Sequence, residues 1–179
     1  MPEIPSELVE QFAAGAASVF AGAGISIGAG MPNWAKLLEP LRAEIPDCPQ
    51  DTPFLDVAQF YENEFRRRRL TEQVHRQINE WVKKPTALHF ALIKLLSAGG
   101  RIFTTNLDTL LESAAKEIKT NFRKIVNTDP PVSFDQDRIS IIKLHGDVEQ
   151  PLSYVITAQD YESYFRKYPG TARLIANEF

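Results

Sequence analysis

The feature that most constrains the fold is an alternation of short apolar runs with helical stretches. Residues 18–21, 101–105, 122–126 and 139–144 are runs rich in β-branched and aromatic side chains, which is typical of strands buried on both faces. Strands that alternate with helices favour a parallel sheet covered by helices on both faces. We therefore predict an α/β, Rossmann-like fold, with a further short strand at residues 154–156.

Helices are predicted from the spacing of apolar residues and from capping residues such as Asn33 and Thr86. They are expected at residues 6–14, 34–41, 54–65, 70–82, 86–98, 108–116, 157–167 and 172–179. Several of them lie between the first two predicted strands, which is long for a simple crossover. We therefore expect residues 1–179 to form a single domain with a small helical insertion at about residues 52–84.

Composition narrows the class of function. The chain has 20 Lys and Arg against 23 Asp and Glu, a formal charge of −3, whereas a protein that binds nucleic acid mainly through phosphate contacts is expected to be basic. Cys48 is the one cysteine, which excludes an internal disulfide and a zinc site built mainly from thiolates. Because no run approaches the roughly 20 apolar residues of a membrane helix, we expect a cytoplasmic protein without membrane, nucleic-acid or metal partners.

The first predicted strand ends in the sequence Gly22-Ala23-Gly24-Ile25-Ser26, here called the glycine turn. Glycines in this position let the backbone approach a pyrophosphate closely, and the Ser26 hydroxyl can donate a hydrogen bond. The usual dinucleotide fingerprint has Gly or Ala where this chain has Ile27. A Walker loop is excluded, because no Lys-Ser or Lys-Thr follows. From the turn alone, a phosphate-binding loop and a plain turn without a ligand remain equally open.

Two later strand ends also carry polar residues. Thr104-Thr105-Asn106-Leu107-Asp108 follows the second predicted strand, and Lys143-Leu144-His145-Gly146-Asp147 follows a later one. Ligands gather at the carboxyl ends of parallel strands, so Asn106, Asp108 and His145 are candidate site residues. A structural interpretation is open for each, since Asn and Asp are favoured helix caps and a histidine at a strand end is more often a satisfied polar group.

In this order, the glycine turn, the Thr-x-Asn-x-Asp motif and the His-Gly motif resemble the sirtuin family, and more closely its bacterial sirtuin-like branch found in antiviral defence proteins. The resemblance extends to Gly30-Met31-Pro32-Asn33-Trp34, to Tyr154-Val155-Ile156-Thr157 and to Asp160-Tyr161. It covers residues from about 15 to about 165 and implies a protein that consumes NAD+ as its substrate.

The resemblance implies a role for each matching residue. The glycine turn would hold the NAD+ pyrophosphate, Asn106 would position the attacking group beside the nicotinamide ribose, Asp108 would hold the nicotinamide carboxamide, and His145 would be the general base at the ribose hydroxyls. Such roles suit the chemistry, because nicotinamide leaves as a neutral molecule and the reaction needs an oriented nucleophile and a base near neutrality rather than an acid. The candidates are Asn106 and His145 for catalysis, and Gly22, Ala23, Gly24, Ser26, Asn33, Thr105 and Asp108 for binding the dinucleotide.

The chain departs from the protein deacylases of that family in two places. Their zinc module has four cysteines where this chain has Cys48 alone, and an Asp and an Arg after their Gly-Ile-Pro are replaced by Asn33 and Ala35. Both losses affect the acyl-peptide cleft and the cofactor loop, which favours water as the nucleophile. We therefore predict a zinc-free NAD+ glycohydrolase that releases nicotinamide and ADP-ribose. A deacylase or ADP-ribosyltransferase, and a non-catalytic module that senses NAD+ or ADP-ribose, are the alternatives.

The defence branch further implies that NAD+ depletion awaits an infection signal, through a homo-oligomer or an associated sensor protein. The family places at least one more strand after the His-Gly motif, so we expect the chain to be the N-terminal part of a longer domain, truncated at its C-terminus. Arg66-Arg67-Arg68-Arg69 is interpreted as a solvated stretch, with a partner contact as the alternative. His75 and His89 lie within helical patterns and are interpreted as structural.

Overall fold

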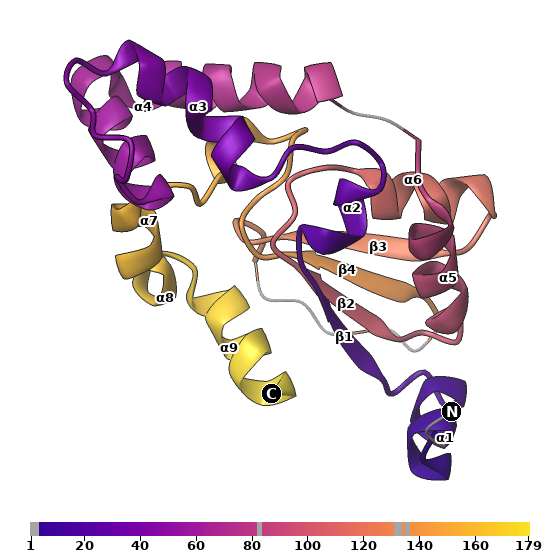
Figure 1. Cartoon of the computed structure of the whole chain (residues 1–179). Coiled ribbons are helices and arrows are strands. Elements are labelled where there is room, and N and C mark those ends of the chain that lie inside the picture. The colour runs from indigo at the N-terminus through magenta and orange to yellow at the C-terminus, as the bar shows by residue number, and fades with distance from the viewer. Residues whose placement is uncertain (1–3, 82–83, 131–133, 135–136) are drawn as a thin grey trace.

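A computed structural model describes residues 4–81, 84–130, 134 and 137–179 (Figure 1). Its centre is a four-stranded parallel sheet with strand order β1-β2-β4-β3. The strands are β1 (Ser18–Ala21), β2 (Arg101–Thr104), β3 (Phe122–Val126) and β4 (Ile139–Lys143). The four longer apolar runs are thus confirmed as strands of one parallel sheet.

Helices account for most of the remaining structure. They are α1 (Ser6–Ala13), α2 (Gly24–Ile27), α3 (Trp34–Glu44), α4 (Phe54–Trp81), α5 (Ala87–Leu95), α6 (Leu110–Glu117), the 3-10 helix η1 (Pro151–Ser153), α7 (Ala158–Glu162), α8 (Tyr164–Lys167) and α9 (Pro169–Glu178). The predicted helices are present, although that at residues 157–167 is divided at Ser163 into α7 and α8. The short helix α2, which continues the glycine turn, was not predicted, and residue 82 of the predicted helix 70–82 lies outside the described residues.

The strand expected at residues 154–156 is wrong. These residues are fully buried, but Tyr154 and Ile156 pack among the side chains of α3 and α4, and Val155 packs against α8. The Val155 N–H donates to the His145 carbonyl, 2.9 Å away, instead of joining the sheet. A short apolar run reports burial, and here helices rather than a neighbouring strand supply the contacts.

Both faces of the sheet are covered, as predicted. On one face Ile102 and Ile141 pack against α5 and α6, which lie together beside the sheet in Figure 1. On the other face Phe103 and Ile142 pack with residues of α9, and the Phe103 ring lies 5.3 Å from that of Phe179. Successive residues of a strand point to opposite faces, which is why every position of β4 is apolar or buried.

The helices α3 and α4 form a second core beside the sheet (Figure 1). Leu38 and Leu41 of α3 pack against Val57, Tyr61 and Leu70 of α4, and all five are at most 1% exposed. Helix α4 occupies most of the expected insertion at residues 52–84, of which residues 82–83 lie outside the described part of the chain. Among the described residues, none of the helices has both the length and the apolar character needed to cross a lipid bilayer.

The sequence suggests that the run of four arginines is solvated, but the structure shows that not all four are. Arg67 is half-buried and its guanidinium contacts Asp160 at 2.7 Å and Glu62 at 3.1 Å, which joins α4 to α7. Arg69 contacts Glu44 at 2.7 Å. Arg66, Arg68 and Arg69 are exposed, as expected of a solvated stretch, and Arg68 has a side chain 89% exposed. Much of this charge therefore holds helices together.

Arg66 divides α4 in two. Its φ of 75° and ψ of 154° lie in a region that essentially only glycine adopts without strain. We expect Arg66→Gly to raise the free energy of unfolding by about 1 kcal/mol. The substitution relieves a backbone strain of about 1–3 kcal/mol. It also costs about 0.5–1 kcal/mol, because glycine gives the unfolded chain more conformational entropy. Thermal denaturation measures the effect.

Arg68→Gly is the matched control, since Arg68 is exposed and lies within the helical part of α4. Glycine in a helix interior costs about 1 kcal/mol, so this variant should melt at a lower temperature than the wild type. Equal losses of stability in the two variants would contradict the strain assigned to Arg66.

Candidate active site

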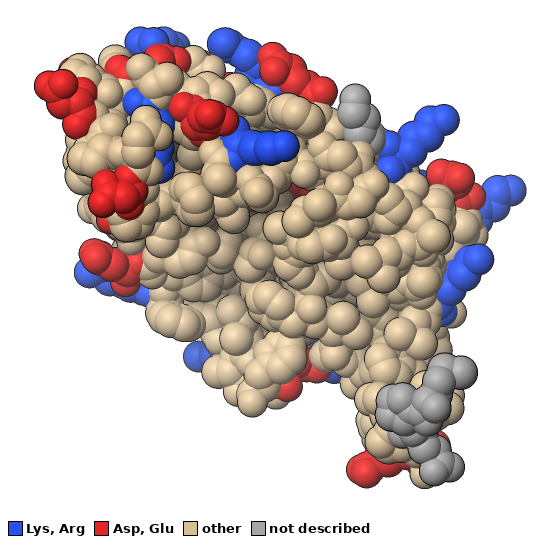
Figure 2. Space-filling model, viewed as in Figure 1, with Lys and Arg blue, Asp and Glu red and all other residues tan. Residues whose placement is uncertain are grey.

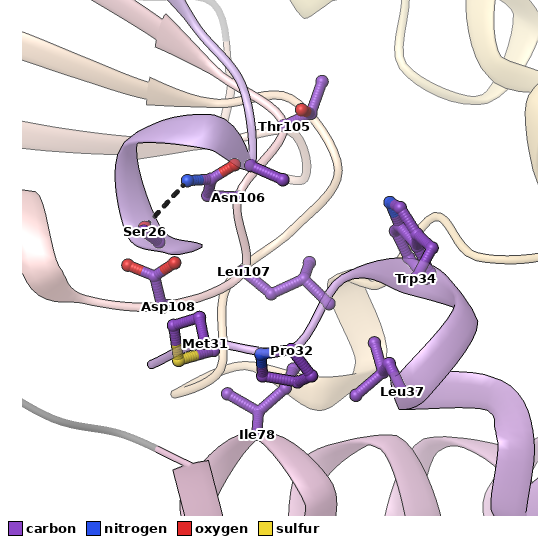
Figure 3. A pocket seen from close by; sticks show the side chains of 11 residues that line it. Ser26, Met31, Pro32, Trp34, Leu37, Ile78, Thr105, Asn106, Leu107 and Asp108 are labelled. Carbon is purple, nitrogen blue, oxygen red and sulfur yellow. Dashed lines mark hydrogen bonds between the residues drawn. The ribbon is translucent and has the colours of Figure 1, made fainter. Parts of the chain in front are cut away.

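A pocket opens at the carboxyl edge of the sheet, where the segments after β1 and β2 meet α3 and α4 (Figure 3). It is lined by Ala23, Ser26, Met31, Pro32, Trp34, Leu37, Ile78, Thr105, Asn106, Leu107 and Asp108. Its volume is about 500 Å³, including the part open to solvent. Figure 2 shows a hollow near the centre of this face, surrounded mostly by uncharged residues.

The pocket brings together five of the nine predicted site residues: Ala23, Ser26, Thr105, Asn106 and Asp108. Gly22, Gly24, Asn33 and His145 are not among its lining residues. Asn33 is exposed, and its Oδ1 accepts a hydrogen bond from the Lys36 N–H at 3.0 Å, so this side chain caps α3.

The two glycines of the glycine turn leave open space. Neither Gly22 nor Gly24 has a positive φ, and a Cβ atom built on either would meet no protein atom within 4 Å. Gly146 differs, with a φ of 96° and a Cβ that would lie 2.5 Å from the Ser153 carbonyl oxygen. The fold thus requires glycine at Gly146 but not at Gly22 or Gly24, where the backbone is open to the close approach of another group.

Asn106 is held from two sides. Its backbone N–H donates to Thr104 Oγ1 at 3.1 Å, and its side-chain Nδ2 donates to Ser26 Oγ at 3.1 Å, the contact dashed in Figure 3. The residue is 8% exposed. Because Nδ2 faces Ser26, the side-chain oxygen Oδ1 is free to accept a hydrogen bond from a hydroxyl group or a water molecule in the pocket.

Asp108 is fixed through its side chain and its backbone. Its Oδ1 accepts from the Leu110 N–H at 3.0 Å, which caps the start of α6, and the ammonium group of the buried Lys143 donates to its carbonyl oxygen. The helix therefore begins two residues later than predicted, and the capping interpretation of Asp108 is compatible with its place in the pocket. One carboxylate oxygen caps the helix while the residue lines the pocket.

His145 follows β4 and is not among the residues that line the pocket. Its Nδ1 is 3.1 Å from Tyr161 Oη, and the two rings are 4.9 Å apart. Burial lowers the pKa of His145 to about 4, and the negative charge of Asp160 opposes this shift only in part. The imidazole is neutral at pH 7, but it is a weaker base than the near-neutral one expected from the sequence.

This pKa predicts a dependence of stability on pH. The folded-state pKa is below the ordinary 6.5, so folding favours the neutral ring. The stability that the neutral ring contributes is fully present above pH 6.5 and is lost as the pH falls toward 4. We expect the free energy of unfolding to fall by about 3 kcal/mol more over that interval in the wild type than in His145→Gln. Urea denaturation at several pH values measures this difference, and parallel curves would contradict it.

The sequence did not predict the part of the apolar pocket wall that α3 and α4 supply through Leu37 and Ile78. Leu37 and Ile78 come from α3 and α4, and their only signal was an apolar stripe that is equally typical of a core. It also missed His89, which is fully buried with Nε2 3.4 Å from Ser26 Oγ. Among the described residues, no group of three or more His, Cys, Asp or Glu side chains is arranged to hold a metal ion.

Fold and pocket together define a class, namely a parallel α/β protein with a pocket at the carboxyl ends of β1 and β2, where such sheets commonly bind ligands. Sequence comparison is more specific, because residues 100–179 match the family described as SIR2-like domain. The resemblance to sirtuin-like proteins that the three motifs indicate is therefore confirmed.

The chain is also similar in sequence to individual curated proteins. The chain is 36% identical over 150 residues to an NAD(+) hydrolase ThsA of Acinetobacter baumannii, a match covering 82% of this chain and 30% of that protein. It is 34% identical over 159 residues to a protein of the same name from Bacillus cereus, covering 83% and 31%, and 33% identical over 168 residues to one from Enterococcus faecium, covering 89% and 33%. The chain spans about a third of the length of these curated relatives.

Proposed function

We propose that the chain carries the site of an NAD+ glycohydrolase, an enzyme that cleaves the nicotinamide–ribose bond to give nicotinamide and ADP-ribose. The observation that carries this proposal is the meeting of Asn106 and Asp108 with Ala23 and Ser26 of the glycine turn in one pocket. The similarity to three proteins named NAD(+) hydrolase, at 33–36% identity, supports the same reaction.

NAD+ would bind with its pyrophosphate against the glycine turn. The open space over Gly22 and Gly24 admits a ligand close to the backbone, and Ser26 can donate its hydroxyl proton. The nicotinamide ring would enter between the polar residues and the apolar wall of the pocket, where the Asp108 carboxylate can accept from the carboxamide N–H. Thr105 completes the polar side of this lining.

The chemical step needs an oriented water molecule. When the bond between ribose C1′ and the nicotinamide nitrogen breaks, its electron pair leaves with nicotinamide, which departs neutral, and the ribose becomes an oxocarbenium ion. A water molecule that donates a hydrogen bond to Asn106 Oδ1 is positioned to attack C1′ and then loses a proton to the surrounding solvent. The products are nicotinamide, ADP-ribose and a proton, so the step needs no reductant and no substrate besides NAD+ and water.

His145 is proposed as the base at the ribose hydroxyls. Strands β2 and β4 are neighbours, with Thr104 paired to Lys143, and the Leu144 N–H donates to the Thr104 carbonyl at 2.8 Å. The segment with Asn106 therefore runs beside the segment with His145. A ribose that extends from the pocket toward the end of β4 would bring its hydroxyl groups to the neutral imidazole.

Water is favoured over an acyl-lysine because α3 and α4 enclose the pocket. We propose that this helical pair stands where the deacylases carry their zinc module, which the single Cys48 cannot build. Trp34, Leu37 and Ile78 supply an apolar wall on that side. An apolar wall favours the binding of a small ligand that loses its hydration water in the pocket.

The biological setting is also a proposal. The site would serve antiviral defence in the cytoplasm by depleting NAD+, under the control of a homo-oligomer or an associated sensor protein. We further propose that residues 1–179 are part of one longer sirtuin-like domain.

Fluorescence of etheno-NAD+ tests the proposed function in the intact, assembled protein. We expect an increase as nicotinamide is released, at the same rate with and without an acylated or acceptor peptide. Release that depends on the peptide would instead support a deacylase or a transferase. Calorimetric binding of NAD+ without turnover in any assembly state would support the sensing module.

A further inference from the structure

His89, the third residue of α5, is buried and has a defined tautomer. Its Nδ1 accepts a hydrogen bond from the Thr86 N–H at 3.1 Å and lies 2.9 Å from Thr86 Oγ1, in the capping box at the start of the helix. A backbone N–H can only donate, so Nδ1 carries no proton. Desolvation lowers the pKa of His89, with the nearby charge of Asp108 opposing it, and the neutral ring carries its proton on Nε2.

The Nε2–H of His89 points to the site. The Nε2 atom of His89 lies 3.4 Å from Ser26 Oγ, and the Nδ2 of Asn106 donates to the same oxygen at 3.1 Å. His89, Ser26 and Asn106 are 0%, 2% and 8% exposed. Two donors thus occupy the lone pairs of one buried hydroxyl oxygen, which fixes the Asn106 amide with Nδ2 toward Ser26 and Oδ1 toward the pocket.

We propose that His89 is a positioning residue of this site, which acts through Ser26 to orient the Asn106 amide for the attacking water. The expected effect on catalysis rests on the proposed function. The orientation of the Asn106 amide rests on the hydrogen bonds alone. The contact of 3.4 Å is long for a hydrogen bond, and we expect it to shorten when NAD+ binds.

The capping role of His89 does not explain its second nitrogen. The N3 residue of a capping box is usually Glu or Gln, which satisfies the N-cap N–H without reaching further. In this chain the imidazole serves Thr86 with one nitrogen and Ser26 with the other. The two roles are therefore separable by substitution.

Two substitutions test the two ring nitrogens of His89 separately. In His89→Asn, the amide oxygen can replace Nδ1 as the acceptor for Thr86 but nothing replaces Nε2. In His89→Gln, the one terminal amide can donate to Ser26 in place of Nε2, but an amide turned toward Ser26 no longer accepts from the Thr86 N–H. We expect His89→Asn to lower kcat for nicotinamide release by roughly 10–100-fold with KM changed by less than about threefold. His89→Gln should stay within about threefold of wild-type kcat at a lower melting temperature.

Steady-state kinetics and thermal melting of both variants test the inference. Activity that follows the melting temperature rather than the donor to Ser26, or a kcat of His89→Asn equal to that of the wild type, would overturn it. A KM that rises with unchanged kcat would also overturn it, because it would assign His89 to substrate binding instead of to the orientation of Asn106.

A second measurement separates this inference from the proposed function. The side-chain amide signal of Asn106 in a 1H–15N spectrum is identified by its loss in Asn106→Ala. We expect that signal to shift and its protons to exchange faster in His89→Asn but not in His89→Gln. An unchanged signal in both would overturn the positioning role whatever the activity, whereas absence of NAD+ cleavage by the wild type would overturn only the proposed function.

Discussion

Replacing Asn106 by alanine is expected to lower kcat for nicotinamide release from NAD+ by roughly 100–1,000-fold, the usual cost of removing one preorganised polar group from a reacting centre. The variant loses the Oδ1 acceptor that would orient the attacking water, and it also loses the donor to Ser26. Steady-state kinetics and calorimetric binding measure the effect. Binding of NAD+ should weaken far less than kcat falls, because the glycine turn is untouched.

Asn79→Ala is the matched control for this substitution. Asn79 lies on the exposed side of α4, where its amide contacts His75 at 2.8 Å. The control should keep the wild-type kcat. Equal activity of Asn106→Ala and Asn79→Ala would remove Asn106 from the mechanism, and equal losses would point to a general effect on the fold.

Replacing Gly24 by alanine is expected to raise KM and the dissociation constant for NAD+ by roughly tenfold without lowering the melting temperature. The new methyl group would meet no protein atom within 4 Å, so the folded chain accommodates it. It would occupy the space through which a pyrophosphate approaches the backbone. The melting temperature and the affinity are measured on the same preparation.

Gly15→Ala is the contrasting variant. Gly15 has a φ of 66°, and a Cβ there would lie 2.3 Å from the Ala98 carbonyl oxygen, before β1 and away from the carboxyl edge of the sheet. This variant should lose about 1–3 kcal/mol of stability and keep its KM where it remains folded. A Gly24→Ala protein that binds NAD+ as the wild type does would contradict the role given to the glycine turn.

The strands and the site motifs were predictable for a common physical reason. Strands buried on both faces are mostly apolar, as in β4, where all five residues are buried and three are isoleucines, and in a parallel sheet their carboxyl ends meet at one edge. Polar residues just after such strands therefore converge, and Ser26, Asn106 and Asp108 do so in the pocket. The order of the motifs along the chain then supplied the family resemblance.

What the sequence did not predict depends on contacts between distant segments. Ile78 reaches the pocket because α4 folds back over the sheet edge, and its apolar stripe does not say which partner it meets. The residues 154–156 are apolar for burial against helices, so the strand assigned to them was wrong. His89 has no local signal at all, since its contact with Ser26 joins residues 63 positions apart.

The central claim is hydrolysis of the nicotinamide–ribose bond by water, and product analysis in H2(18)O tests it most directly. The intact protein is incubated with NAD+ in labelled water, and nicotinamide and ADP-ribose are quantified by mass spectrometry. We expect equal amounts of the two products, with one 18O atom on C1′ of the ADP-ribose. Nicotinamide formed without labelled ADP-ribose, or no cleavage of NAD+ in any assembly state, would contradict it.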